Sequence, residues 1–158
     1  MDKTVPALTI NPSEETILVG SISVRFLVTG DDSSQSAALF EFTVPKGAKL
    51  PSLPHSHDAY EETVYGLSGM LTWIVDGQQY EVEQGQALCI PRGAVHSFVN
   101  HGQEEARLLV TISPAALGPA FFRETAEIIN AAAGGPPDPI KMAGVLRRHG
   151  LTPAPPPA

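Results

Sequence analysis

The chain has 158 residues, 42% of them hydrophobic and 17% charged, a balance typical of one globular domain with a sizeable core. The formal net charge is −7 and no basic run exceeds Arg147-Arg148, which argues against nucleic acid as a partner. Neither a basic leader followed by an apolar stretch nor a membrane-length apolar segment is present. We therefore expect no membrane partner and a cytoplasmic location.

Residues 1–15 show no periodic apolar pattern and are predicted to form an irregular arm. The following hundred residues, 16–114, alternate short apolar runs with turn residues, which is typical of an all-β domain. The runs interpreted as strands are 15–29 (one or two strands), 37–44, 62–67, 70–75, 78–83, 87–90, 96–100 and 106–113.

The periodicity changes after Ser113-Pro114. Residues 119–133 carry apolar side chains at helical spacing and end at a glycine pair, which predicts a helix. Residues 138–150 predict a second, short helix with Asp138 as its N-cap. We therefore predict a helical segment over 115–150 that covers a face of the β domain or forms a dimer contact. The Pro-rich residues 151–158 are predicted to be a disordered tail.

A lone cysteine, Cys89, excludes an intramolecular disulfide. It lies in the apolar run 87–90 and is predicted to be a buried small hydrophobic residue.

Three histidines and a carboxylate, His55, His57, Glu62 and His96, stand at informative spacings. In a strand, alternate side chains share a face, so His55 and His57 should point the same way. Pro54, immediately before His55, disfavours a helix there. His96 comes from a separate strand, so these side chains can meet only in a folded sheet structure.

Neutral imidazoles and one ionised carboxylate form a good site for one divalent transition metal: Fe, Mn, Ni, Co, Cu or Zn. Any one of the histidines alone would more often be a hydrogen-bonded core or surface residue, but the four groups together indicate a metal site. Glu61 neighbours Glu62, and on a strand only one of the two can face inward. His101 and His149 follow neither spacing and are expected to be solvated.

The segment around the first two histidines resembles the first cupin motif. That motif is HxH, three or four residues, Glu, six residues and Gly, matched here by His55, His57, Glu62 and Gly69. The six-residue gap to Gly69 selects Glu62 over Glu61. One departure lies upstream, where Gly47 stands farther from His55 than the family pattern has it, which lengthens a loop.

The second cupin motif is matched by Gly85, Pro91, Gly93, His96 and Asn100. The resemblance covers roughly residues 40–101. It implies a double-stranded β-helix, the cupin jelly-roll barrel, with one or two short C-terminal helices outside it. It also implies that the metal is held inside the barrel by the three histidines and Glu62.

A looser resemblance, over residues 20–130, is to single-domain cupins grouped with quercetin 2,3-dioxygenases. It implies a metal-dependent dioxygenase that acts on a small aromatic or enol-like substrate and uses dioxygen, with Glu62 as ligand and proton acceptor. Aromatic residues near the motifs are candidates for the pocket: Phe40, Phe42, Tyr65, Trp73 and Phe98. Phe121 and Phe122 could close the mouth of the barrel or anchor the helix.

Two other functions remain open, because one fold and one metal sphere can serve many chemistries. The metal could act as a Lewis acid in a lyase, isomerase or decarboxylase, or the protein could be a non-catalytic small-molecule binder. A closed structural zinc site is disfavoured because a barrel of this size does not need a metal to fold. Unpaired strand edges and the size of the chain favour a homodimer.

Overall fold

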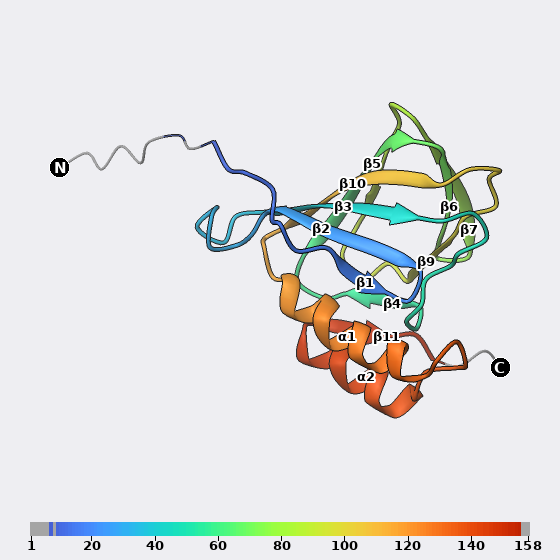
Figure 1. The fold of residues 1–158 in the computed structure, drawn as a ribbon. Helices are drawn as coiled ribbons and strands as arrows, with labels where there is room; N and C mark the ends of the chain where they lie inside the picture. The colour runs from blue at the N-terminus through green and yellow to red at the C-terminus, as the bar shows by residue number, and fades with distance from the viewer. Residues whose placement is uncertain (1–6, 8, 156–158) are drawn as a thin grey trace.

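Two antiparallel β-sheets face each other, with two helices on one side of them (Figure 1). The structure is a computed structural model that describes residues 7 and 9–155. The six-stranded sheet has the order β1 (Ile17–Val19), β2 (Ile22–Val28), β3 (Ala38–Val44), β10 (Ala106–Ser113), β5 (Glu61–Ser68) and β8 (Ala87–Ile90). The five-stranded sheet has the order β11 (Leu151–Pro153), β4 (His55–His57), β9 (His96–Val99), β6 (Met70–Val75) and β7 (Gln78–Glu83). The predicted all-β double-stranded barrel is confirmed.

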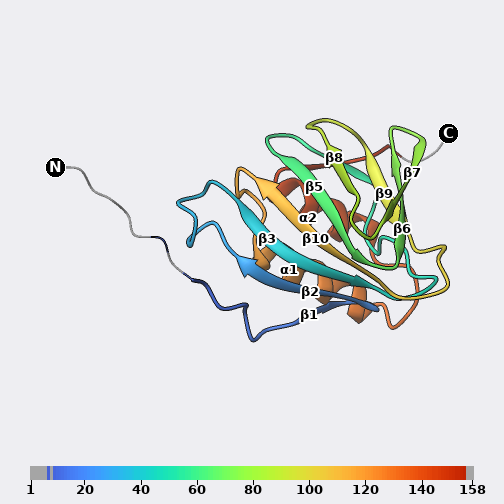
Figure 2. The same cartoon turned by 90° about the horizontal axis from the view of Figure 1, so that it is seen from above.

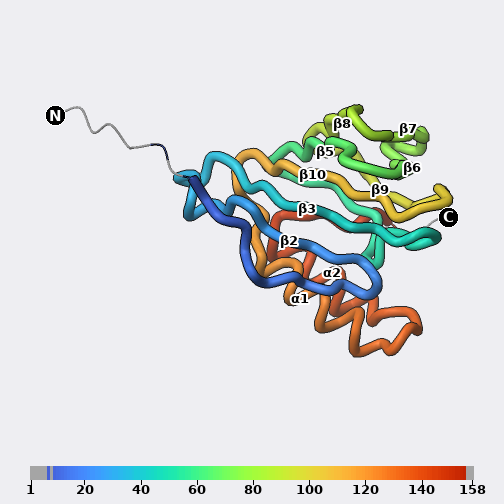
Figure 3. The backbone as a smooth tube through the Cα atoms, turned by 45° about the horizontal axis from the view of Figure 1, so that its top comes forward, coloured from blue at the N-terminus to red at the C-terminus, as the bar shows by residue number. Residues whose placement is uncertain are grey.

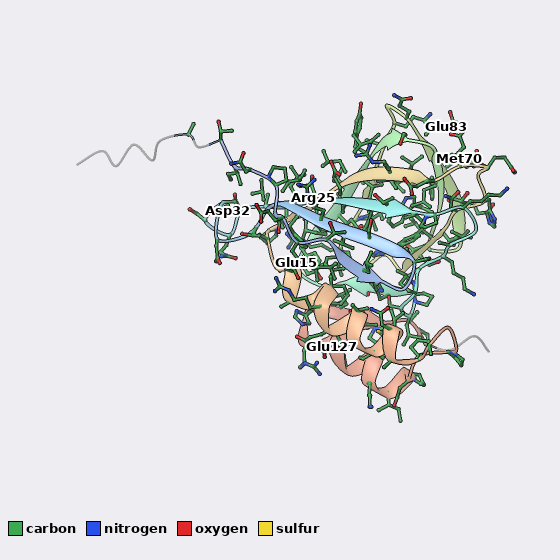
Figure 4. All side chains as sticks on the ribbon, viewed as in Figure 1. Glu15, Arg25, Asp32, Met70, Glu83 and Glu127 are labelled. Carbon is green, nitrogen blue, oxygen red and sulfur yellow. The ribbon has the colours of Figure 1, made fainter. Side chains whose placement is uncertain are left out.

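Alternation along the strands places the core between the sheets. In β3 the buried residues Ala38, Phe40, Phe42 and Val44 alternate with half-buried ones. Strand β10 lies between β3 and β5 (Figure 3). Its buried side chains alternate along the strand and continue the same layer. The side chains drawn in Figure 4 fill the space that the ribbons leave between the sheets. Burial of this continuous apolar layer is the main force that holds the sheets together.

Gly69 makes the bend between β5 and β6 possible. Its φ of 69° lies in the left-handed region, and a Cβ atom there would stand 2.3 Å from the carbonyl oxygen of Glu105. Only glycine avoids both the backbone strain and the clash. This bend carries the chain from one sheet to the other.

The C-terminal helices α1 (Pro119–Ala131) and α2 (Pro139–Arg148) lie beside each other beneath the sheets when seen from above (Figure 2). Asp138 caps α2 as predicted, because its Oδ1 accepts hydrogen bonds from the backbone N–H groups of Ile140 and Lys141 at 2.9 and 3.1 Å. Helix α1 packs on β1, and α2 packs on β11. We call α1, α2 and β11 together the cap.

Two predictions about local structure were wrong. Leu151–Pro153 does not begin a disordered tail but forms β11, which pairs with β4; residues 156–158 lie outside the described residues. Cys89 is exposed, because β8 is the edge of its sheet and Cys89 points away from the core that Ile90 enters. In both cases the deciding neighbour is remote in sequence, so local composition could not reveal it.

None of the helices in the described part of the chain is long and apolar enough to cross a membrane.

Candidate metal centre

The four predicted ligand residues come from three strands. His55 and His57 lie on β4, Glu62 on β5, and His96 on β9. Strands β4 and β9 are neighbours, and His55 is the register partner of His96. Strand β5 belongs to the facing sheet, so Glu62 approaches the histidines across the barrel interior. The structure thus brings together residues that are up to 41 positions apart, from 55 to 96.

His55, His57 and His96 form what we call the histidine cluster. One ring nitrogen from each lies within 4.8 Å of the others. The carboxylate oxygen Oε2 of Glu62 lies 3.2 Å from Nε2 of His96 and 3.6 Å from Nε2 of His57. All four side chains are buried. These three nitrogens can hold a metal ion. Glu62 is not part of that group, but it lies beside two of its three histidines.

Backbone carbonyls fix the orientation of two imidazoles. Nδ1 of His55 lies 2.7 Å from the carbonyl oxygen of Leu53, and Nδ1 of His96 lies 3.0 Å from that of Ala94. A carbonyl oxygen only accepts hydrogen bonds, so each Nδ1 must carry the proton and leave Nε2 to bind a metal. Such outer hydrogen bonds are what orients histidine ligands in metal sites. A divalent transition metal therefore fits this donor set.

His57 is held differently. Its Nδ1 is buried and has no hydrogen-bond partner among residues 7 and 9–155. The ring of Tyr60 lies 4.6 Å from its ring, and the Tyr60 hydroxyl donates to the carbonyl oxygen of His149 at 3.3 Å. Packing against Tyr60, rather than a hydrogen bond, sets the position of this imidazole.

Burial and mutual repulsion keep the histidine cluster largely neutral. Burial lowers the pKa of His55 to about 3, with further lowering by His96 and His57. Burial also lowers the pKa of His57 to about 4, although Glu62 opposes this. An imidazole binds a metal only in its neutral form, so His55 and His57 can bind a metal at neutral pH without losing a proton.

Glu62 and His96 form the charged part of the site. Burial opposes ionisation of Glu62, but its hydrogen bond with His96 and its attraction to His57 outweigh burial and lower its pKa. Burial likewise opposes protonation of His96, and Glu62 outweighs it, so the pKa of His96 is raised. A metal cation would take the place of the His96 proton beside the ionised Glu62.

Glu61 faces away from this site. Its Oε1 lies 2.8 Å from Nε of Arg92, and both side chains are partly exposed. The alternation along β5 therefore puts only Glu62 inside, as the motif spacing indicated.

Beside the histidine cluster lies a largely apolar cavity of about 60 Å³. Its wall is mainly aromatic and runs from the cap to the histidines: Phe121, Phe122, Phe40, Phe42, Phe98 and Trp73. Successive ring centres in this wall lie 5.0 to 5.9 Å apart, for example 5.1 Å between Phe122 and Phe40 and 5.1 Å between Phe98 and Trp73. Glu62 is the one carboxylate that lines the cavity in the described chain.

Most of the predicted aromatic residues line this cavity, but Tyr65 does not. Phe40, Phe42, Trp73 and Phe98 all contribute to its wall. Tyr65 is 43% exposed, because it points outward from β5 between the inward-facing Val64 and Gly66. A pocket role for Tyr65 was therefore a wrong prediction.

The two remaining histidines differ from each other. His101 is exposed, as expected. The prediction that His149 is solvated was wrong, because its side chain is only 18% exposed and its Nε2 lies 2.9 Å from Oε1 of Glu124. Helix α1 packs across it, and the Phe121 ring lies 5.5 Å away. His149 thus joins the two cap helices and takes no part in the histidine cluster.

Several cavity residues were not predicted. Thr125 and Leu151 enter the cavity from the cap, Leu117 enters it from the segment just before α1, and Leu50 and Ser52 enter it from the loop before β4. The apolar face of α1 was visible in the sequence, but its place over the cavity depends on its packing against β1, which is remote in sequence. Only Phe121 and Phe122 gave a signal, as two adjacent large rings on the face expected to be buried.

Asn100, the last residue of the second motif, has a structural role. Its side-chain nitrogen donates to the carbonyl oxygens of Val44 and Glu104 at 2.9 Å each, and its side-chain oxygen accepts from the backbone N–H of Gly102 at 2.9 Å. These bonds tie the end of β3 to the loop after β9.

The cupin domain family matches residues 40–112, which contain all four predicted ligand residues. Protein SchB of Streptomyces halstedii is 31% identical over 96 residues, which cover 61% of this chain and 69% of that protein. The chain belongs to the cupin family. The fold and both motifs agree with this assignment.

Two further relatives carry functional names. Polyketide synthase CurC of Streptomyces cyaneus is 39% identical over 67 residues, which cover 42% of this cupin and 44% of CurC. Quercetin 2,3-dioxygenase of Bacillus subtilis is 27% identical over 97 residues, which cover 61% of this cupin and 28% of the dioxygenase. This chain thus spans less than half the length of either protein.

Among solved structures, a predicted oxalate decarboxylase from Thermotoga maritima matches with a TM-score of 0.57. It is 20% identical in sequence, and the match covers 66% of this chain and 93% of that one. This likeness concerns the fold alone.

Proposed function

We propose that this cupin is a metal-dependent dioxygenase that acts on a small aromatic or enol-like substrate. The observation that carries the proposal is a buried cluster of three imidazoles, with Glu62 beside two of them, that lines a largely aromatic cavity. The similarity to a relative named quercetin 2,3-dioxygenase supports this choice of reaction.

Nε2 of each histidine, with Glu62, would hold one divalent metal. When bound, the metal would supply a site at which the deprotonated substrate oxygen and dioxygen can react together. A redox-active metal such as Fe, Mn, Ni, Co or Cu suits this chemistry better than Zn.

Glu62 would receive the substrate's hydroxyl proton. It is the carboxylate in the cavity wall, and its interactions with the histidines keep it ionised, so its carboxylate group can accept a proton. Its position near His96 and His57 places it next to the oxygen that the metal would bind. Substrate deprotonation and metal binding would therefore occur at one place.

The aromatic wall would orient the substrate and exclude water. Rings that pack edge-to-face, such as Phe40 on Phe42 with centres 5.2 Å apart, leave flat surfaces for a planar substrate. A cavity of about 60 Å³ holds only a few water molecules. Even a one-ring substrate would require the side chains around the cavity to move, and a flavonol would require a larger movement.

The alternative function is an isomerase or lyase, and the single carboxylate base in the cavity favours it. One ionised carboxylate beside a metal that polarises a carbonyl is sufficient to move a proton between carbon and oxygen without oxygen uptake. The name of CurC points to polyketides, which are rich in enolisable carbonyl groups. An isomerase or lyase that uses the same residues is thus the alternative, and a non-catalytic binder would use the same cavity.

Metal analysis of the purified protein, followed by oxygen-electrode assays, tests the proposal. The protein would be loaded with the metal found and offered quercetin and the one-ring enol-ketone allomaltol. Near one metal per chain and substrate-dependent oxygen uptake support the dioxygenase. One metal per chain with substrate consumption but no oxygen uptake supports the alternative enzyme, and a protein that cannot be loaded with metal contradicts both. Glu61→Gln is the matched control for Glu62→Gln, and only the second should stop turnover.

A further inference from the structure

The helix α1 places one hydroxyl group in the otherwise apolar part of the cavity wall. Thr125 lines the cavity, is 3% exposed, and comes one turn after Phe121. The other cavity-lining residues from this segment are Leu117, Phe121 and Phe122. Thr125 is therefore the one polar side chain that the cap presents to the cavity within the described residues.

The hydroxyl of Thr125 has no hydrogen-bond partner in the part of the chain that the structure describes. A threonine inside a helix commonly donates to the carbonyl oxygen four residues earlier, and here that bond is not formed. A buried hydroxyl without a partner is unfavourable, so a residue that needed only to fill space would be better as valine. The arrangement points to a partner that arrives from the cavity.

A second unpaired donor lies in the same cavity. Nε1 of Trp73 is buried and also has no partner among the residues described. Trp73 belongs to β6, its ring lies 5.1 Å from Phe98 and 6.2 Å from the ring of His96, and it lines the cavity. The cavity thus offers two unpaired polar groups besides the histidines and Glu62, one from the cap and one from the barrel.

We propose that Thr125 is a specificity-determining residue that pairs with a second polar substituent of the substrate, distinct from the oxygen that the metal would bind. Trp73 Nε1, which can only donate, favours an acceptor oxygen on the same substrate. The substrate class is therefore a small planar enol-ketone with an additional hydroxyl or ether oxygen. This inference rests on the proposed function only in assigning the enol-ketone oxygen to the metal.

Selectivity of this kind comes from the cost of leaving a buried polar group unpaired. When a site forms a hydrogen bond to a substrate hydroxyl, an analogue without that hydroxyl leaves a buried group unpaired and is rejected strongly. An apolar site rejects a molecule with an extra hydroxyl less strongly. Loss of one such bond should change affinity by about five- to tenfold.

Two hydroxypyranones provide matched probes. Kojic acid and allomaltol share the same enol-ketone and differ by one hydroxyl, which only kojic acid carries on its methyl substituent. Trp73 is the single tryptophan of the chain and lines the cavity, so its fluorescence reports binding without any turnover. Binding to the metal-loaded protein would be measured without oxygen, and by calorimetry as a second readout.

We expect the wild type to bind kojic acid more tightly than allomaltol, and Thr125→Val to remove that preference by weakening kojic acid five- to tenfold. Thr125→Ser, which restores the hydroxyl, should restore the preference. Thr72→Val is the matched control, because the Thr72 hydroxyl is also buried and unpaired but does not line the cavity. It should leave both affinities unchanged.

The inference is overturned if the wild type does not distinguish the two probes, if it binds neither, or if Thr125→Val weakens both equally. Its failure is separable from that of the proposed function. The protein could prefer kojic acid through Thr125 and still take up no oxygen. That result would support the inference and contradict the dioxygenase.

Discussion

The histidine cluster and the cap enclose the same cavity but are built in opposite ways. The cluster consists of buried polar groups on β4 and β9, with Glu62 opposite on β5, inside the residues that match the cupin family. The cap lies beyond the matched residues and contributes mostly apolar side chains, with its ion pairs near the surface. Under the proposed function, the barrel would supply the chemistry and the cap would help select the molecule that reaches it.

The largest expected effect is the loss of the metal site. His96→Ala should weaken metal binding by more than about 100-fold, because loss of mere outer hydrogen bonds to ligands already costs 10–100-fold. Metal content after dialysis and titration calorimetry would measure it. The matched control is His101→Ala, which changes an exposed histidine. Full metal content in His96→Ala would contradict the site assignment.

Disruption of the cap core should affect stability without affecting the metal. Leu146 in α2 is fully buried, so Leu146→Ala should lower the free energy of unfolding by about 2–5 kcal/mol. Urea unfolding would measure this change, and elemental analysis should still find the wild-type metal content. Ile140→Ala on the same helix, where the side chain is 83% exposed, should cost far less. Loss of metal in Leu146→Ala would show that the two regions are not separable.

The metal-free barrel should lose stability in acid. Histidine in the unfolded chain takes up a proton near pH 6.5, but burial lowers the pKa of His55 to about 3 and that of His57 to about 4. Between these values the unfolded state binds more protons, so the free energy of unfolding should fall as the pH falls from about 6.5 toward 4. The raised pKa of His96 has the opposite sign and offsets part of this loss.

Urea unfolding of the metal-free protein at pH 7, 6 and 5 would measure this dependence. His55→Gln should give a flatter profile, because one of the two buried neutral histidines is gone. Stability that rises as the pH falls would contradict the described balance of burial and charge.

The smallest expected effect concerns the ion pairs within the cap. Glu124 on α1 bonds to Arg148 and His149 at the end of α2, and both Glu124 and Arg148 are exposed to solvent. Glu124→Gln should lower the free energy of unfolding by less than about 1 kcal/mol, because water and salt weaken exposed ion pairs. Thermal unfolding at low and high salt would measure it. A larger loss would mean that the cap depends on these contacts more than on its apolar face.

The sequence by itself determined the barrel and the positions of the candidate ligands. Strand alternation places His55 and His57 on one face and separates Glu62 from Glu61, and the glycines of the motifs fix bends such as that at Gly69. These features follow from the geometry of adjacent residues along one strand, so they can be predicted locally.

Only the tertiary structure decided how the cavity is closed. The pairing of Leu151–Pro153 with β4 joins residues almost a hundred positions apart. The packing of α1 on β1 and α2 brings Thr125 to the cavity and partly buries His149. It also decided that Cys89 faces outward, because that depends on which surface of the edge strand β8 is covered. The outward direction of Tyr65 was predictable, since Tyr65 stands three residues after the inward-facing Glu62 on β5. Contacts between remote segments depend on the whole arrangement of the sheets, so local patterns of residue type do not predict them.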